Sequence, residues 1–552
     1  MSVNLYETPI TPIVDLDSDV VVYVPGYAQK GPLEPTLVTA DTFASIFGEA
    51  PYTFSGGDDT STETYNTLER NAPDRGWLYA KGLLDSGLTV LYHRIPDKAS
   101  TAYATTEEVR LYTKPVFTSS EPEPEEVLSE SLKIRFRAKF PGSYYSNFSV
   151  SVGSFSRKVQ KLTVYLNGEE VQSRSVSFNP EDPFFIGKSG LFDNIELVFY
   201  RDGKEVSNVA EVFELFDIYQ PAEGSTAGYV RIQTPAETTK EGETLKASYT
   251  LSMPKTSSTE PPAPEFTVST FLTNLGTKLD DLLDTDTYPT VTYITSGGYY
   301  QTATLAQKML AVAANIRAIA LIDFSDSVDS IQTALEEIGA DTTEYIKGAA
   351  FVGANTFKIY GDSRIMADSY GYLTKLGKNL SQAIPAWIPV ANVPQGVTTA
   401  VATTRAISFA ARATLIPADN RGIAVNPIVY KQNSGYTIMG NRTLAKLNGV
   451  TGPDAFLNCQ LVVNSVLRAA RRAASDLLIV STSPATAFST FCSVVSKTCD
   501  KMMVNGDGLA AYNITKLKKT KPATIDIQIA LTLVEGIETF NIYVPYEIAL
   551  DA

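Results

Sequence analysis

The single histidine, His93, is the first side chain to test for chemistry, because a serine hydrolase triad would have to use it as the general base. It lies near the end of an apolar segment, Leu88–Arg94, that is predicted to be a strand. No Gly-x-Ser-x-Gly elbow occurs anywhere in the sequence to supply the nucleophile. A lone histidine on such a strand is more often structural than catalytic, so we predict that the chain is not an enzyme.

Phosphate and metal chemistry are equally hard to build from this sequence. Gly297-Gly298 lies between a predicted strand and a predicted helix, where a phosphate loop would lie. It lacks the third glycine of the dinucleotide fingerprint and the Gly-Lys-Ser/Thr of a P-loop, so we predict a tight turn. Cys459, Cys492 and Cys499 fit no zinc spacing and are expected to be small buried thiols. No cofactor or metal site is predicted.

Two basic segments occur in an acidic chain of net charge −15. Their residues are Arg468, Arg471 and Arg472 within one turn of a predicted helix, and Lys516, Lys518, Lys519 and Lys521 before a predicted strand. Each set is either a solvated face or an electrostatic contact to an acidic partner, which would tune specificity and register more than affinity. The net charge argues against nucleic acid as the main partner.

The length of 552 residues predicts two to four domains. No apolar run reaches the length of a membrane span, and the N-terminus lacks the pattern of a signal peptide. We therefore expect synthesis inside the cell without export and no membrane insertion.

Two Pro-, Ser-, Thr- and Glu-rich segments, 114–126 and 253–265, are predicted to be paired linkers around an inserted β-rich domain. Between them, Val159–Leu166 alternates apolar and polar residues and ends at Asn167-Gly168, a strong hairpin signal. From about 288 to 400, strand and helix patterns alternate, which predicts a mostly parallel sheet covered by helices. The strands are Val291–Ile294, Ala318–Phe324, Ala349–Val352 and Ala386–Val390, and the helices are Ala303–Ala314, Val328–Ile338 and Ser363–Leu380.

The C-terminal part combines two long helices, about twenty residues from Ala455 and then Ala485–Met503, with two alternating strands, Thr524–Leu533 and Phe540–Leu550. Pro545 places the last strand at a sheet edge. That strand either pairs within its own domain or completes a sheet in a neighbouring subunit. Its apolar face consists of Phe540, Ile542, Val544, Tyr546, Ile548 and Leu550.

The stretch Val20–Gly48 holds the most informative series of signals. An apolar strand and a small-residue turn lead to Lys30 before Gly31-Pro32, then to an extended Leu-Val-Thr, and then to a short helix that stops at Gly48. This series resembles the amino-terminal signature of contractile phage tail sheath proteins.

Three further segments resemble the same family. Phe140–Asn147 is similar to its Tyr-Pro-Gly-x-x-Gly-Asn element, with Tyr145 where a glycine is usual. Arg317–Phe324 is similar to its Arg-aliphatic-Leu-Asp strand. Arg421-Gly422 with Asn426, followed by Gly435–Leu444, is similar to the segment entering its C-terminal domain, with Met439 in place of a tryptophan.

The resemblance implies a structural subunit that forms hexameric rings, stacked helically around a tail tube, and contacts baseplate and tail terminator proteins. Contraction would drive the tube through the host envelope. The fold implied is a multidomain α/β plus α+β protein with a subtilisin-like, non-proteolytic core. The subunit would belong to the tail sheath of a virion assembled in the host cytoplasm.

Carried onto this chain, the resemblance gives five parts: an N-terminal arm at 1–19, an α/β core at 20–113 with 266–420, an outer β-rich domain at 114–265, a tube-facing α+β domain at 421–536 and a C-terminal arm at 537–552. The arms would tie neighbouring subunits together. Either basic set could face an acidic tube. Two alternatives remain open: a tailocin or contractile injection system sheath, and a subtilisin-like or nucleotide-binding enzyme with a β insertion.

Overall fold

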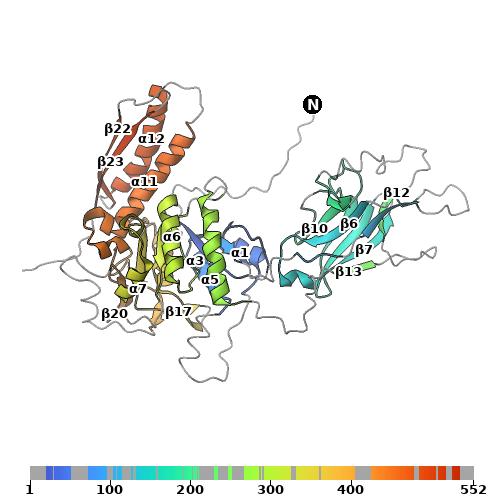
Figure 1. The fold of residues 1–552 in the computed structure, drawn as a ribbon, viewed down its shortest axis with the longest axis horizontal. Coiled ribbons are helices and arrows are strands. Elements are labelled where there is room, and N and C mark those ends of the chain that lie inside the picture. Colours follow the sequence, from blue (N-terminus) through green and yellow to red (C-terminus); the bar gives the residue numbers. More distant parts are fainter. Residues whose placement is uncertain are drawn as a thin grey trace, which may run out of the picture.

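The computed structural model shows a mixed α/β chain in which a central unit lies between a β-rich unit and a helical unit (Figure 1). The residues that it describes are 20–28, 30–50, 72–95, 103–106, 109–114, 126–127, 132–156, 159–188, 190–201, 203–207, 209, 229–233, 247–250, 266–284, 288, 291–324, 331–359, 362–403, 424–477, 484–504, 508–517 and 525–534. The predicted arms at 1–19 and 537–552, including the apolar face of Phe540–Leu550, lie outside these residues. So do most of the two predicted linkers.

The central unit is built on an 8-stranded sheet of order β2-β3-β1-β14-β15-β16-β20-β21. Its inner strands are parallel, and β2 and β21 add antiparallel edges. The strands are β2 (Thr36–Val38), β3 (Thr89–Arg94), β1 (Val21–Gly26), β14 (Tyr293–Ile294), β15 (Ile319–Ile322), β16 (Gly348–Val352), β20 (Asn426–Lys431) and β21 (Gly435–Ile438). Strands β1, β15 and β16 are buried at every position, as expected for parallel strands covered on both faces.

Helices cover both faces of this sheet and divide its side chains into two cores. On one face, Val22 and Val24 of β1 share a core with helices α1 (Ala40–Phe47), α3 (Arg75–Asp85) and α9 (Asp368–Ser381). On the other face, Val21 and Tyr23 share a core with α5 (Val268–Lys278), α6 (Ala303–Ile316), α7 (Ile331–Ile338) and α8 (Thr342–Tyr345). Alternate residues of one strand therefore hold both helical layers.

Most predicted elements of this unit are confirmed within a few residues, but two are wrong. Ala386–Val390 is a turn, not a strand, because Pro385 precedes it, Pro389 lies within it and Ile388 donates its N–H back to the Pro385 carbonyl. The next parallel strand after β16 is β20. The helix predicted from Ser363 begins at Asp368, because Ser363 lies in β18 (Asp362–Ile365), which pairs with β17 (Thr356–Ile359); β19 (Ala400–Ala402) completes that small sheet.

The β-rich unit contains two antiparallel sheets around a core of its own. The first contains β11 (Lys204–Glu205), β10 (Ile195–Arg201), β6 (Leu132–Ala138), β4 (Val109–Lys114), β12 (Tyr229–Gln233) and β5 (Glu126–Val127), and the second contains β13 (Ala247–Thr250), β7 (Phe148–Ser156), β8 (Val159–Leu166) and β9 (Glu169–Ser177). The hairpin between β8 and β9 is confirmed: Asn167 and Gly168 both have positive φ, 52° and 86°, as a type I′ turn requires.

The C-terminal unit packs two helices against a two-stranded antiparallel sheet. The elements are α11 (Leu457–Ser475), α12 (Pro484–Met503), β22 (Leu509–Lys516) and β23 (Ile527–Leu533). Both long helices are confirmed, as is the alternation that turns Ile527, Ile529 and Leu531 toward the helices. Strand β22 was not predicted, since its small and polar residues give no clear alternation.

Candidate functional site

Two of the segments that carry the family resemblance meet in space, although they are more than a hundred residues apart. The Gly31 N–H donates to the Tyr145 hydroxyl at 3.2 Å, and the Lys30 ammonium lies 5.4 Å from the centre of the Tyr144 ring. Tyr145 thus makes a specific contact at the position where the family usually has a glycine. The contact joins the central unit to the β-rich unit.

Arg94, at the end of β3, is the centre of the same joint. Its buried guanidinium donates to the carbonyls of Ala28 and Gly31 in one segment and of Pro141 in the other, at 2.7 to 2.8 Å. A buried arginine is tolerated only where its donors are satisfied, and here backbone carbonyls accept them. Ala28 and Gly31 are therefore held to the Phe140–Asn147 segment.

Asn426 forms the hydrogen bonds that fix the segment Gly435–Leu444, which resembles the entry to the C-terminal domain of the sheath family. Its side-chain amide donates to the carbonyls of Ala350 and Arg442, and its oxygen accepts from the Arg442 N–H at 2.7 Å. A Cβ at Gly440 would lie 2.5 Å from that oxygen, so only glycine fits there. This network fixes the chain as it leaves the sheet for α11.

The sheet of β22 and β23 has two open edges within the described part of the chain, because each strand pairs only with the other. Beyond β23, the Val534 carbonyl accepts from the Asn458 amide at 3.3 Å and from the Cys459 thiol at 3.5 Å. These contacts hold the chain against the start of α11 just before the predicted C-terminal arm. Open edges of this kind can accept a strand from another chain.

The two basic sets occupy different environments. Lys516 is exposed at the end of β22, with its ammonium 5.9 Å from the centre of the Phe488 ring. Lys518, Lys519 and Lys521 lie outside the described residues. Arg468 lines a cleft beneath α11, where burial lowers its pKa to about 10. Arg471 and Arg472 line the outer part of the same cleft.

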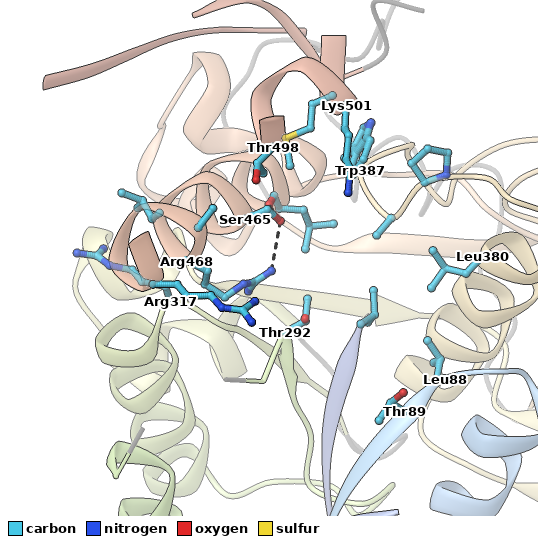
Figure 2. Close-up of a pocket in the computed structure, with 18 of the residues that line it drawn as sticks. Leu88, Thr89, Thr292, Arg317, Leu380, Trp387, Ser465, Arg468, Thr498 and Lys501 are labelled. Atoms are coloured by element: carbon cyan, nitrogen blue, oxygen red, sulfur yellow. Dashed lines mark hydrogen bonds between the residues drawn. The ribbon is translucent and has the colours of Figure 1, made fainter. Parts of the chain in front are cut away.

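This cleft, of about 740 Å³, lies where α11 crosses the amino ends of the parallel strands. Val20, Thr89 and Thr292, at the starts of β1, β3 and β14, form its floor. Figure 2 shows Arg317, which follows α6, and Arg468 of α11 lying close together among the residues that line it. Nearby, Lys347 donates to Gln460 and Asn464 of α11, and so ties the helix to the start of β16.

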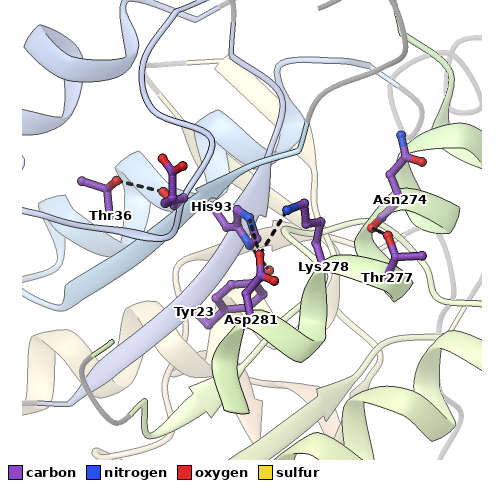
Figure 3. Close-up of polar contacts among 8 residues, drawn as sticks. Tyr23, Thr36, His93, Asn274, Thr277, Lys278 and Asp281 are labelled. Atoms are coloured by element: carbon purple, nitrogen blue, oxygen red, sulfur yellow. Dashed lines mark hydrogen bonds and ion pairs between the residues drawn. The ribbon is translucent and has the colours of Figure 1, made fainter. Parts of the chain in front are cut away.

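His93 is built into the packing and has no catalytic geometry. Tyr23 bonds to its Nδ1 at 2.8 Å, and Asp281, which pairs with Lys278, lies 3.8 Å from its Nε2 (Figure 3). Burial, followed by the positive charge of Lys278, lowers the imidazole pKa to about 3. The ring is therefore neutral near pH 7 and has a phenol, not a nucleophile, on its Nδ1.

The carboxyl end of the sheet, where doubly wound α/β proteins bind ligands, is filled with backbone. Gly297 has φ +71°, and a Cβ there would lie 2.0 Å from the Pro25 carbonyl oxygen. A Cβ at Gly76 would lie 2.6 Å from the Gly26 Cα. The predicted turn at Gly297-Gly298 is confirmed, and it closes the position where a phosphate would bind.

Among the described residues no group of three or more His, Cys, Asp or Glu side chains is placed to hold a metal. The three cysteines are free thiols; Cys459 and Cys499 are buried, and Cys492 is partly exposed. Within the same part of the chain, no helix has the length and apolarity that crossing a bilayer requires.

No protein-family model and no curated protein matches the sequence. Among solved structures, the sheath tail protein of Desulfitobacterium hafniense is 11% identical, with a TM-score of 0.44, and the match covers 97% of this chain and 100% of that one. The sheath tail protein of Listeria innocua is 9% identical, with a TM-score of 0.48 and coverage of 93% and 95%. The contracted sheath of an extracellular contractile injection system is 15% identical, with a TM-score of 0.38 and coverage of 50% and 80%.

The chain is similar to contractile tail sheath proteins.

Sequence reasoning missed Arg94 and Lys347 as residues that join the units, and Arg317 as a cation of the cleft. Arg317 did carry a signal, since it is a charged residue directly after a helix, where glycine is usual. Arg94 and Lys347 gave none, because their partners lie on other elements.

Proposed function

We propose that this chain is the sheath subunit of a contractile tail. Copies form hexameric rings stacked helically around a tail tube, contact baseplate and tail terminator proteins, and contract to drive the tube through a host envelope. In a phage the sheath belongs to the virion and is assembled in the host cytoplasm; in a contractile injection system the mechanics are the same. The α/β unit is the subtilisin-like core of that family.

The observation that carries the proposal is the contact between the resembling segments. Gly31, Arg94 and Tyr145 join the Val20–Gly48 series to the Phe140–Asn147 element by direct hydrogen bonds. Residues that resemble a family by chance have no reason to meet in one joint. The filled carboxyl end of the sheet and the neutral, buried His93 support a mechanical role over an enzymatic one.

Self-assembly would use the open sheet of β22 and β23. In this proposal the arm Phe540–Leu550 of one subunit, together with an N-terminal arm of about Val3–Leu16, adds strands to that sheet in a neighbour. The β-rich unit lies outermost. Of the two basic sets, we assign Lys516, Lys518 and Lys519 to the tube, because Lys516 is exposed whereas Arg468 is turned into the cleft.

Negative-stain electron microscopy of the full chain, beside a chain that ends at Gly536, tests the proposal. The ending keeps β23 and Val534 intact and removes only the arm. We expect rings or hollow tubes from the full chain and none from the shortened one. A full chain that stays monomeric at high concentration, with and without a tube protein, contradicts the sheath function. Tubes from both chains contradict the assignment of Phe540–Leu550 as the arm that links neighbouring subunits.

The tube contact has its own test. K516Q/K518Q/K519Q should weaken assembly around the tube and reduce its salt dependence, while the unassembled subunit keeps its stability. K308Q, which breaks an exposed ion pair with Asp280, is the matched control. It should change neither assembly around the tube nor its salt dependence. Equal assembly of both variants would remove the lysines from the tube interface.

A further inference from the structure

We propose that the cleft beneath α11 binds the acidic segment Asp15–Asp19 of the same chain. This inference goes beyond the proposed function and does not depend on it. It rests on the charge of the cleft, on the backbone at Arg317 and on the point where β1 begins.

The described residues that line the cleft carry charge of one sign only. Five cationic side chains line it and no carboxylate does, in a chain of net charge −15. The cations are Arg317, Arg468, Arg471, Arg472 and Lys501. Arg317, Arg468 and Lys501 repel one another around a half-enclosed space, so an anionic occupant stabilises them.

Arg468 gives the most direct evidence that the cleft accepts an anion. Its Nη2 donates to the Ser465 hydroxyl at 3.2 Å, but its Nη1 is buried and has no hydrogen-bond partner among the described residues (Figure 2). A buried guanidinium nitrogen is normally satisfied, and a carboxylate can accept from two of its N–H groups at once.

Arg317, which lines the same cleft from the end of α6, adds an independent observation. It directly follows α6 with φ +60°, a left-handed conformation that glycine or asparagine adopts with little strain. A long cationic side chain at such a position is retained at a cost in backbone strain. Its charge also reaches Lys347, whose pKa is lowered to about 8 by burial first and by Arg317 next, against the opposing charge of Asp454.

The occupant follows from chain connectivity. Val20 lines the cleft and directly precedes β1, so the residues before it leave the sheet at this end. Those residues include Asp15, Asp17 and Asp19, whose period of two puts them on one side of an extended chain. Five extended residues span about 17 Å, enough to pass along the cleft. Tethering gives this segment an effective concentration in the millimolar range, which favours it over a free anion.

Hydrogen–deuterium exchange of the full-length chain tests the proposal. We expect the amides of residues 14–19 to exchange at least about tenfold more slowly in the wild type than in D15N/D17N/D19N or in R317Q/R468Q. A variant that combines D15N/D17N/D19N with R317Q/R468Q should lose no more protection than either set alone, because both sets remove the same contact. K516Q, a basic residue outside the cleft, should leave the protection unchanged.

The acidic variant alters no described residue, so it keeps the test valid if R317Q/R468Q disturbs α11. Equal exchange in the wild type and D15N/D17N/D19N overturns the proposal. Protection that appears only at concentrations where the chain oligomerises places the segment in another copy and overturns docking within one chain. If inorganic phosphate raises the melting temperature of the wild type but not of R317Q/R468Q, while residues 14–19 stay unprotected, the cleft is an anion site and the proposal fails.

Discussion

The two ends of the central sheet are built in opposite ways. At the carboxyl end, the last residues of β1 pack backbone to backbone against Gly76 of α3 and against the Gly297 turn that follows β14. At the amino end, α11 spans a cleft of about 740 Å³ lined by cations. Open α/β sheets usually bind their ligands at the carboxyl end. Here the carboxyl end serves packing and carries the joint to the β-rich unit at Arg94, while the amino end meets α11 of the C-terminal unit. Both ends therefore join units, which suits a subunit that works by assembly.

The largest expected effect lies at the carboxyl end. Gly297→Ala should lower the free energy of unfolding by about 4 kcal/mol, since the new methyl group meets the Pro25 carbonyl and the residue must keep a positive φ. Gly339→Ala is the matched control, because Gly339 has φ +62° with no atom within 4 Å of the added Cβ. Gly339→Ala should lower the free energy of unfolding by about 1 kcal/mol. Equal losses in urea unfolding, followed by tryptophan fluorescence, would mean that the carboxyl end is not tightly packed.

At the amino end, Lys347→Met should cost about 2 to 3 kcal/mol, because it leaves the amide oxygens of Gln460 and Asn464 without their donor. Hydrogen exchange should also accelerate in α11. Lys308→Met, which removes a half-exposed ion pair with Asp280, should cost about 0.5 kcal/mol or less. If the two variants melt alike, Lys347 does not hold α11 to the sheet.

The pH dependence of stability tests the packed state of His93. Its folded pKa of about 3 lies below its ordinary value of 6.5, so its contribution to stability is complete above pH 6.5 and is lost as pH falls toward 3. Between pH 6.5 and 5 the loss should reach about 2 kcal/mol. Asp323 acts in the opposite direction below pH 6, since burial raises its pKa to about 6.

The comparison between wild type and His93→Gln isolates the histidine, because Asp323 is common to both. The variant should show a flatter loss of stability between pH 6.5 and 5 in urea unfolding at matched pH values. Parallel curves would mean that His93 is protonated in the folded protein, which would contradict its burial.

The smallest expected effect is a gain. Arg317→Gly should raise the free energy of unfolding by about 0.5 to 1 kcal/mol, because glycine adopts the left-handed backbone without strain. Arg317→Ala removes the same charge without relieving that strain, so its thermal unfolding should show no comparable gain. Equal melting temperatures for the two variants would show that Arg317 is unstrained.

Local patterns predicted much of this fold because they report on local physics. The buried strand at Val21–Gly26, the helix that stops at Gly48 and the hairpin at Asn167-Gly168 each follow from residues within one segment. Ala386–Val390 misled the prediction, since its short apolar run resembles a strand until Pro385 before it and Pro389 within it are given full weight.

The candidate site was less predictable, because its contacts join distant segments. Helical spacing put Arg468 beside the apolar stripe of α11, but which element covers that face depends on how the helix crosses the sheet. The hydrogen bond between Gly31 and Tyr145 likewise depends on packing between units. The resemblance identified both segments without showing that they touch.

A cryo-electron microscopy map of the assembled full-length chain tests the central claim most directly. We expect density that continues from Val20 along the cleft beneath α11, an added strand at the open sheet of β22 and β23, and backbone alone at the Gly297 turn. An empty cleft, or ligand density at the carboxyl end of the sheet, would contradict the division of roles between the two ends.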